Sequence, residues 1–263
     1  MIRVQGHFGE FLQGRLGPEG PVVLVTLPCP LLTVGIRRTE ATEPHGLLSL
    51  SRGRALLKAL GLADPGPVTL SANMPRGGGG GVSTAALVAL ARLAGSRHDA
   101  MELAGACVGV EGASDPLMFD APERLLWASR RAEIVRELPA LPAMDIVGGF
   151  VGPNRRTNAA DENFADIADL IAPWEAAARA ADLPALAALT SESAHRNRAL
   201  RGPAGDPTPG LCRALGALGH TAAHTGSARG LIFAPGQAPK DATTRLHAAG
   251  FRRVVTFRTG GGA

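Results

Sequence analysis

Tyrosine is absent from the 263-residue sequence, and aromatic residues make up only 4% of it. Proteins that bind single-stranded nucleic acids stack bases on aromatic side chains, so this class of protein is disfavoured. Lysine is scarce as well: Lys58 and Lys240 are the only two, and the other 25 basic residues are arginines scattered along the chain. Because the net charge is only +4 and the basic residues form no stripe, we expect no nucleic-acid partner.

Long apolar runs are also missing. The most apolar segment, residues 21–36, is interrupted by Pro28 and Pro30, and no stretch reaches the roughly 18 uninterrupted apolar residues of a membrane span. Residues 1–7 lack the apolar region of a signal peptide. From these absences we expect a cytoplasmic protein with no membrane partner.

Cysteine is scarce and dispersed. Cys29, Cys107 and Cys212 stand far apart and form no Cys-x-x-Cys pair, which indicates neither a disulfide framework nor a zinc site. Hydrophobic residues, by contrast, make up 45% of the chain, which is sufficient for a packed core. The length is compatible with one or two domains.

Apolar periodicity, punctuated by glycine and proline, predicts a succession of strands and helices. The predicted strands are 11–14, 21–26, 32–37, 67–72, 144–151, 231–234 and 254–257. The predicted helices are 52–60, 85–93, 100–110, 162–172, 173–181, 184–200, 209–223 and 241–249. The proline-rich segment 138–143 is the predicted domain boundary, which divides the chain into domains at 1–142 and 143–263.

Two histidines fall on one of these predicted helices. His220 and His224 would share a helix face at the spacing i, i+4, but the glutamate that stands between such histidines in zinc proteases is missing. We therefore interpret both histidines as structural.

The most unusual segment is the run of five glycines from Gly77 to Gly81, directly before a strong helix former. Glycine loses more backbone entropy on folding than any other residue, so such a run is expected where the backbone curls tightly around a ligand. A helix that begins near Ser83 adds unpaired amides and the positive end of its dipole. The pattern predicts an anion site for nucleotide phosphates, with Ser83 and Thr84 offering hydroxyls to phosphate or Mg²⁺.

Two common nucleotide-binding motifs do not account for this loop. No Gly-Lys-Ser/Thr follows the glycines, so the loop is not a Walker A motif. The loop also lies too far into the chain for a Rossmann turn and lacks the acidic residue about 20 positions further on. A flexible linker is the remaining alternative, and the helix that follows at once favours the anion site.

The segment resembles a motif of a known family. A strand with a proline, then a Gly-x-Gly-x-Gly loop, then Ser-Thr-Ala at the start of a helix is similar to the second motif of the GHMP kinases (galactose, homoserine, mevalonate and phosphomevalonate kinases). Residues 6–14 and 28–31 resemble the opening of the L-threonine kinase branch used in cobalamin biosynthesis. Three further segments resemble the acidic motif, the late glycine motif and the glycine-rich end of that branch: 111–119, 223–231 and 259–262.

The resemblance implies an α+β fold of two domains, with mixed or antiparallel sheets and helices packed on them. It also implies the cofactors ATP and Mg²⁺, and transfer of the γ-phosphate to the hydroxyl of a small amino acid, L-threonine. A kinase for another hydroxyl compound, such as homoserine, and a nucleotide-binding regulatory protein without turnover stay open as alternatives. The expected oligomeric state is a monomer or a homodimer.

The resemblance also assigns roles to individual residues. Asp115 is the expected base that accepts the hydroxyl proton, and Ser83 and Glu111 are the expected Mg²⁺ ligands, with Ser83 also counted as catalytic. The residues expected to bind the nucleotide are Pro75, Gly77, Gly78, Gly79, Gly80, Gly81, Ser83 and Thr84. The residues expected to bind the acceptor are Glu10, Thr225, Gly226 and Ser227.

Three positions depart from the family pattern. Val82 replaces the first serine of the usual pair, one extra residue separates Glu111 from Asp115, and His7 stands where many members carry a lysine. The arginines that could bind an acceptor carboxylate are Arg155, Arg156 and Arg229, and the sequence does not select among them.

Overall fold

The computed structural model describes residues 1–40, 46–155 and 158–261. Its strands form one nine-stranded sheet in the order β5-β4-β2-β1-β7-β8-β6-β9, and β3 pairs with a second part of β2. The strands are β1 (Ile2–Arg15), β2 (Val22–Arg38), β3 (Val68–Ala72), β4 (Leu125–Ala128), β5 (Glu133–Glu137), β6 (Met144–Phe150), β7 (Gly219–Ala222), β8 (Ala228–Phe233) and β9 (Arg252–Thr259). The helices are α1 (Leu50–Ala59), α2 (Val82–Leu93), α3 (Ala100–Glu111), α4 (Ala168–Arg179), α5 (Leu183–Arg201), α6 (Thr208–Ala214) and α7 (Ala242–Ala248). The predicted α+β fold with antiparallel pairing is confirmed.

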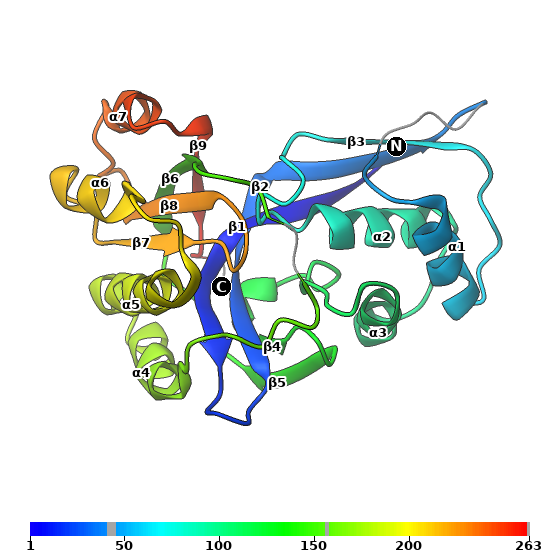
Figure 1. The fold of residues 1–263 in the computed structure, drawn as a ribbon, viewed down its shortest axis with the longest axis horizontal. Helices are drawn as coiled ribbons and strands as arrows, with labels where there is room; N and C mark the ends of the chain where they lie inside the picture. The colour runs from blue at the N-terminus through cyan, green and yellow to red at the C-terminus, as the bar shows by residue number, and fades with distance from the viewer. Residues whose placement is uncertain (41–45, 156–157, 262–263) are drawn as a thin grey trace.

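The long β1–β2 hairpin joins the two halves of the molecule. In the view of Figure 1, α1, α2 and α3 lie on one side of this hairpin and α4 to α7 lie on the other. The only named-strand pairing between the halves in the described chain is a bridge from Glu10 of β1 to Ala222 of β7. The sheet therefore continues across the predicted boundary at 142/143, and the division into two domains stays a prediction.

The middle of β1 is irregular. The register between β1 and β2 shifts at three places between Gln5 and Leu12, and Gly9 has a φ of +76°. Bulges of this kind re-aim backbone groups and are common beside functional sites. Here they turn the amides of His7 and Gly9 away from β2 and toward the glycine loop, where they donate to Gly80 and Gly79.

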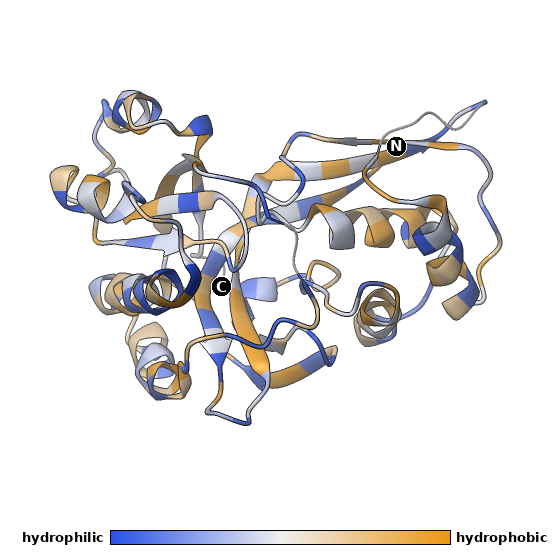
Figure 2. Ribbon diagram, in the orientation of Figure 1, coloured by the Kyte–Doolittle hydropathy of each residue, from blue (hydrophilic) through white to orange (hydrophobic). Residues whose placement is uncertain are grey.

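Helix α2 is buried almost all round. Its sequence combines alanine with leucine and valine, so it packs against β1 and β2 on one side and α1 and α3 on the others. The first part of β2 is equally apolar, and Figure 2 shows it as a continuous hydrophobic stripe. This core supports the segment that enters α2, which is the glycine loop.

Local signals predicted several helices well. The predictions at 52–60, 85–93, 100–110 and 241–249 match α1, α2, α3 and α7 within three residues at each end, and 184–200 matches α5. Asp99 forms a capping box with Glu102 at the start of α3. Because such caps act over three residues, the sequence alone is enough to reveal them.

Three helix predictions differ from the structure. The helix predicted over 209–223 ends at Ala214, because Gly216 adopts a φ of +65° after the helix end and the chain then enters β7. The segments 162–172 and 173–181 form a single helix, α4, that begins only at Ala168 and runs through Pro173. A proline removes one backbone hydrogen bond there, but the buried faces of Leu170 and Trp174 keep the helix in place.

The strand predictions were too short or incomplete. The predictions at 21–26 and 32–37 belong to one strand, β2, which continues through Pro28 and Pro30 at the irregular part of its pairing with β1. β4, β5 and β7 had no strand prediction, and β1 begins nine residues earlier than 11–14 suggested. Among the described helices, none is both long and apolar enough to cross a bilayer.

Candidate active site

The glycine loop between β3 and α2 has an alternating backbone conformation. Gly77, Gly79 and Gly81 have φ values of +69°, +80° and +74°, whereas Gly78 and Gly80 do not have positive φ. Alternation of left- and right-handed residues turns successive amides toward one concave side, which is an arrangement that binds anions. Side chains are excluded as well, since a Cβ on Gly79 would overlap the Cβ of Ala223.

The carbonyl groups of this loop are held on the opposite side. Gly77 O accepts from Arg155 N at 2.9 Å and Gly78 O accepts from Ala228 N at 2.8 Å. Gly79 O and Gly80 O accept from the β1 amides of Gly9 and His7, both at 3.2 Å. Three separate segments therefore fix the direction of the loop.

The amides of 79–84, unlike the carbonyl groups of the loop, have no hydrogen-bond partner in the described part of the chain. Gly81 is the N-cap of α2 and supplies no side-chain cap, so the first-turn amides and the positive end of the helix dipole remain available to a ligand. Such a helix start is suited to binding an anion, and the predicted phosphate site stays a prediction.

A hydroxyl and a carboxylate meet beside the start of α2. Ser83 Oγ donates to Glu111 Oε1 at the end of α3, and Arg52 of α1 lies 3.1 Å from the same oxygen. Burial raises the pKa of Glu111, while the bonds from Ser83 and Arg52 oppose this shift. A buried carboxylate paired with a hydroxyl offers the hard oxygen ligands that Mg²⁺ prefers, so these residues fit the predicted cation site.

Asp115 lies on the loop that follows α3. Gly112 ends α3 with a φ of +75°, and the Asp115 amide then donates to Thr84 Oγ1 at 3.2 Å. Next to it, the Ser114 carbonyl accepts from the Trp127 indole at 2.7 Å, which holds the loop against β4. Asp115 therefore has a fixed place near the start of α2.

A histidine on β1 accompanies this carboxylate. His7 Nε2 lies 3.4 Å from Asp115 Oδ2, and the His7 side chain is only 2% exposed. Burial opposes ionisation of Asp115, but His7, together with smaller contributions from His224 and Thr84, outweighs it and lowers the pKa of Asp115. Asp115 is therefore an ionised carboxylate at neutral pH.

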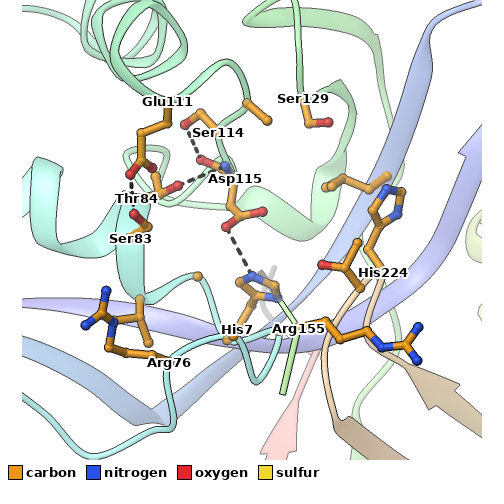
Figure 3. A pocket seen from close by; sticks show the side chains of 18 of the residues that line it. His7, Arg76, Ser83, Thr84, Glu111, Ser114, Asp115, Ser129, Arg155 and His224 are labelled. Carbon is orange, nitrogen blue, oxygen red and sulfur yellow. Dashed lines mark hydrogen bonds and ion pairs between the residues drawn. The ribbon is translucent and has the colours of Figure 1, made fainter. Parts of the chain in front are cut away.

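One cavity of about 180 Å³ brings these groups together (Figure 3). In this view Ser83, Glu111 and Asp115 lie above His7, which a dashed line joins to Asp115, and Arg155 lies at the lower right. The predicted site residues that line the cavity are Glu10, Gly77, Gly79, Gly80, Gly81, Ser83, Thr84, Glu111, Asp115 and Thr225.

Four predicted residues lie outside the cavity wall. Pro75 and Gly78 shape the loop, since Gly78 N donates to Pro75 O at 3.1 Å. Gly226 packs so closely on Gly78 and Gly79 that it has no room for a side chain. Ser227 is buried and donates to Asn154 Oδ1 at 2.6 Å. These contacts shape the loop and its supporting turn.

The arginines that were candidates to bind an acceptor carboxylate differ in their contacts. Arg229 forms a buried ion pair with Asp206 at 2.9 Å and donates to the Gly226 and Ala228 carbonyls, so it is engaged in holding the turn after β7. Arg155 lines the cavity and is exposed. Arg156 lies outside the described residues.

Sequence reasoning missed several cavity residues. Arg76, Arg130, Ser129 and His224 line the cavity without having been predicted there. The i, i+4 spacing placed His224 on a helix face with His220, and this was wrong. His220 lies in the strand β7 and His224 follows that strand. No local pattern marks the other three, which the fold brings together from separate segments.

No protein-family model matches this sequence, and no curated protein matches it. Solved structures do match over nearly the whole chain. Phosphomevalonate kinase of Streptococcus pneumoniae, in complex with phosphomevalonate and AMPPNP, is 12% identical, with 98% of this chain and 100% of that chain covered and a TM-score of 0.62. Mevalonate kinase of L. major, in complex with R-mevalonate, is 14% identical, with 100% and 97% covered and a TM-score of 0.63. Homoserine kinase from Cytophaga hutchinsonii is 15% identical, with 100% and 94% covered and a TM-score of 0.61. The chain has the fold shared by these GHMP kinases.

Proposed function

We propose that this protein is a kinase that uses ATP and Mg²⁺ to phosphorylate the hydroxyl group of a small amino acid, with L-threonine as the expected acceptor. The observation that carries the proposal is the shared cavity, which the unpaired loop amides, the Ser83–Glu111 pair and the Asp115 carboxylate all face. Phosphoryl transfer needs a cradle for the phosphates, a cation and a group that accepts the hydroxyl proton. Each of the three features supplies one of these requirements.

The phosphates are expected to bind the amides of 79–84. The positive end of α2 favours their negative charge. Because no lysine lies near the loop, we assign the additional positive charge to arginine. Arg76 and Arg155 line the cavity, and neither side chain has an ion-pair partner among the described residues.

Asp115 is the proposed base. Its carboxylate is ionised at neutral pH and is a quarter exposed toward the cavity, so it is able to accept a proton from an acceptor hydroxyl there. The buried His7 side chain contacts this carboxylate. In this arrangement the histidine takes the place of the lysine that many GHMP kinases carry.

The cation site is proposed at Ser83 and Glu111. Bound Mg²⁺ would neutralise phosphate charge during transfer. We expect Glu111→Gln to raise the Mg²⁺ concentration for half-maximal activity by about 10-fold or more, because the amide removes the anionic ligand while keeping the shape. The measurement is a Mg²⁺ titration of turnover, with Glu133→Gln as control since that side chain is exposed on β5. An unchanged titration in Glu111→Gln would remove Glu111 from the cation site.

The choice of acceptor rests on two supports. Residues 6–14 and 28–31 resemble the L-threonine kinase branch, and the cavity wall carries a further arginine able to face an amino-acid carboxylate, Arg130. L-homoserine carries the same charged groups with its hydroxyl one carbon further away. It is the second candidate, and a homoserine kinase is among the proteins that share the fold.

An ADP-release assay with a panel of acceptors tests the proposal. The panel contains L-threonine, D-threonine, L-serine, L-homoserine and mevalonate, each with ATP and Mg²⁺. Turnover that depends on L-threonine supports the proposed acceptor, and turnover only with L-homoserine replaces it. Calorimetric binding of ATP with no turnover on any acceptor would instead indicate a nucleotide-binding protein without kinase activity.

A further inference from the structure

Three titratable side chains form a row that leads from the cavity into the core. Asp115 is 25% exposed at the cavity, whereas the side chains of His7 and Glu10 behind it are each 2% exposed. His7 Nε2 lies 3.4 Å from Asp115 Oδ2, and His7 Nδ1 lies 3.6 Å from Glu10 Oε1. The imidazole thus stands between two carboxylates, with one ring nitrogen facing each.

Backbone contacts hold the buried end of this row. Nδ1 of His7 lies 3.2 Å from the carbonyl of Gly9, which can only accept, so Nδ1 carries a proton. Glu10 Oε2 accepts from the amide of His224 at 2.6 Å. Because His7 and Glu10 flank the bulge of β1, the irregular strand itself sets their spacing.

This geometry favours a proton relay over a metal site. The ligand atoms of the three side chains lie within 4.8 Å of one another, a spacing compatible with a metal ion. Each carboxylate, however, faces its own ring nitrogen, and the Nδ1 proton lies between the Gly9 carbonyl at 3.2 Å and Glu10 Oε1 at 3.6 Å. A metal-binding histidine must give up the proton on its ligating nitrogen. To bind the same ion, both carboxylates would have to lie on the side of that one nitrogen.

The surrounding charges determine which of the three side chains are protonated at neutral pH. Burial favours neutral His7, but Asp115 and Glu10 outweigh it and raise the pKa of His7 to about 9. Burial raises the pKa of Glu10 to about 7, while the charge of His7 opposes this shift. Asp115 therefore stays ionised and His7 stays protonated, and Glu10 is the member of the row that takes up a proton near neutral pH.

Other elements add little negative charge to this row. From the turn after β7, His224 faces both carboxylates, but burial lowers its pKa to about 3, so it is neutral. From β8, Arg229 contributes a positive charge toward Glu10, and from the end of α3, Glu111 contributes a negative charge toward Asp115. The charge balance around Glu10 thus depends mainly on His7.

We propose that Asp115, His7 and Glu10 form one buried relay in which Glu10 receives a proton when the acceptor hydroxyl is deprotonated. The proposal rests on the proposed kinase function with Asp115 as base. When the hydroxyl proton binds Asp115, the Nδ1 proton of His7 moves to Glu10. Before the step the row carries two protons, both on His7, and a net charge of −1. After it, Asp115, His7 Nε2 and Glu10 hold one proton each, and the row is neutral.

The relay predicts a pH dependence of turnover. Glu10 must be ionised to receive the proton, so kcat is expected to rise with pH through about 7. His7 must be protonated to donate, so kcat is expected to fall as pH rises through about 9. In Glu10→Gln the rise near pH 7 is expected to disappear, and kcat to fall by about 10- to 100-fold, less than loss of the base itself. The KM for ATP should stay unchanged.

Glu10→Asp separates the relay from a merely structural role. This variant keeps the charge but widens the 3.6 Å gap to His7, so it is expected to retain the rise near pH 7 with a reduced kcat. If Glu10→Gln is poorly folded, Glu10→Asp therefore still tests the relay. Glu19→Gln, at an exposed position outside the cavity, is the control for loss of one carboxylate.

A measurement without catalysis completes the test. Proton NMR of His7 in wild type should show a high midpoint, near pH 9, and Glu10→Gln should lower it because one negative neighbour is lost. If Glu10→Gln keeps the wild-type kcat profile, the relay is wrong while the kinase function stands. If no acceptor is turned over, the proposed function fails, and the NMR titration still decides whether Glu10 and His7 are coupled; an unshifted midpoint would overturn the relay.

Discussion

Asp115→Asn is expected to reduce kcat by about 10²- to 10⁴-fold, the usual contribution of a positioned acid or base, while leaving ATP affinity nearly unchanged. Asparagine keeps the size of the side chain, but its amide oxygen accepts no proton at neutral pH. The nucleotide is expected to contact the loop amides and Ser83 rather than the Asp115 carboxylate. The loss should therefore appear in kcat.

The measurement combines ADP release with calorimetric ATP binding. Asp120→Asn is the matched control, because Asp120 lies five residues further along the same loop with an exposed side chain. Wild-type turnover in Asp115→Asn would exclude Asp115 as base. Equal losses of turnover and ATP affinity would mean that the substitution disturbs the nucleotide site instead.

Gly79→Ala is expected to weaken ATP binding by about 100-fold or more. Charge-assisted hydrogen bonds are worth about 1.5–3 kcal/mol each, so loss of two loop amides corresponds to at least this factor. The loop has no room to adapt, because the new Cβ would overlap Ala223 and approach Gly226 at 3.4 Å. The carbonyl bonds of the loop to β1 and β8 prevent the backbone from moving aside.

Gly17→Ala provides a control matched in backbone conformation. Gly17 has a φ of +81°, against +80° at Gly79, but a Cβ at Gly17 meets nothing within 4 Å. Both variants carry the left-handed strain of about 1–3 kcal/mol, so both should lose stability in thermal unfolding. Only Gly79→Ala should lose ATP affinity in calorimetry. Equal affinities in the two variants would contradict the phosphate site.

Short-range signals account for the parts of the structure that were predicted well. The capping box at Asp99, the helix-forming run after Gly81 and the glycine stop after α1 each involve residues within one turn of one another. The same holds for the loop itself: glycines that alternate in φ are permitted by their lack of a Cβ. The presence of a glycine loop with left-handed residues at a helix start was thus predictable from the residues alone.

Long-range pairing accounts for what was missed. β7 was predicted as part of a helix, and only the bridge from Glu10 and the pairing with β8 make its four residues a strand. Arg229 was a candidate for substrate binding until the fold placed it against Asp206, 23 residues earlier in the chain. Contacts between residues so far apart in the chain produce no periodic pattern in the sequence.

The sequence by itself determined that a bare glycine loop enters a helix, since backbone freedom and helix propensity are properties of neighbouring residues. Only the tertiary structure decided which way the loop amides point, because the groups that hold its carbonyls come from β1, from the start of β8 and from Arg155. It also decided that His7 and Glu10 stand behind Asp115, more than 100 positions away in the chain. Hydrogen bonds between remote segments form only after the sheet has assembled, so no local pattern encodes them.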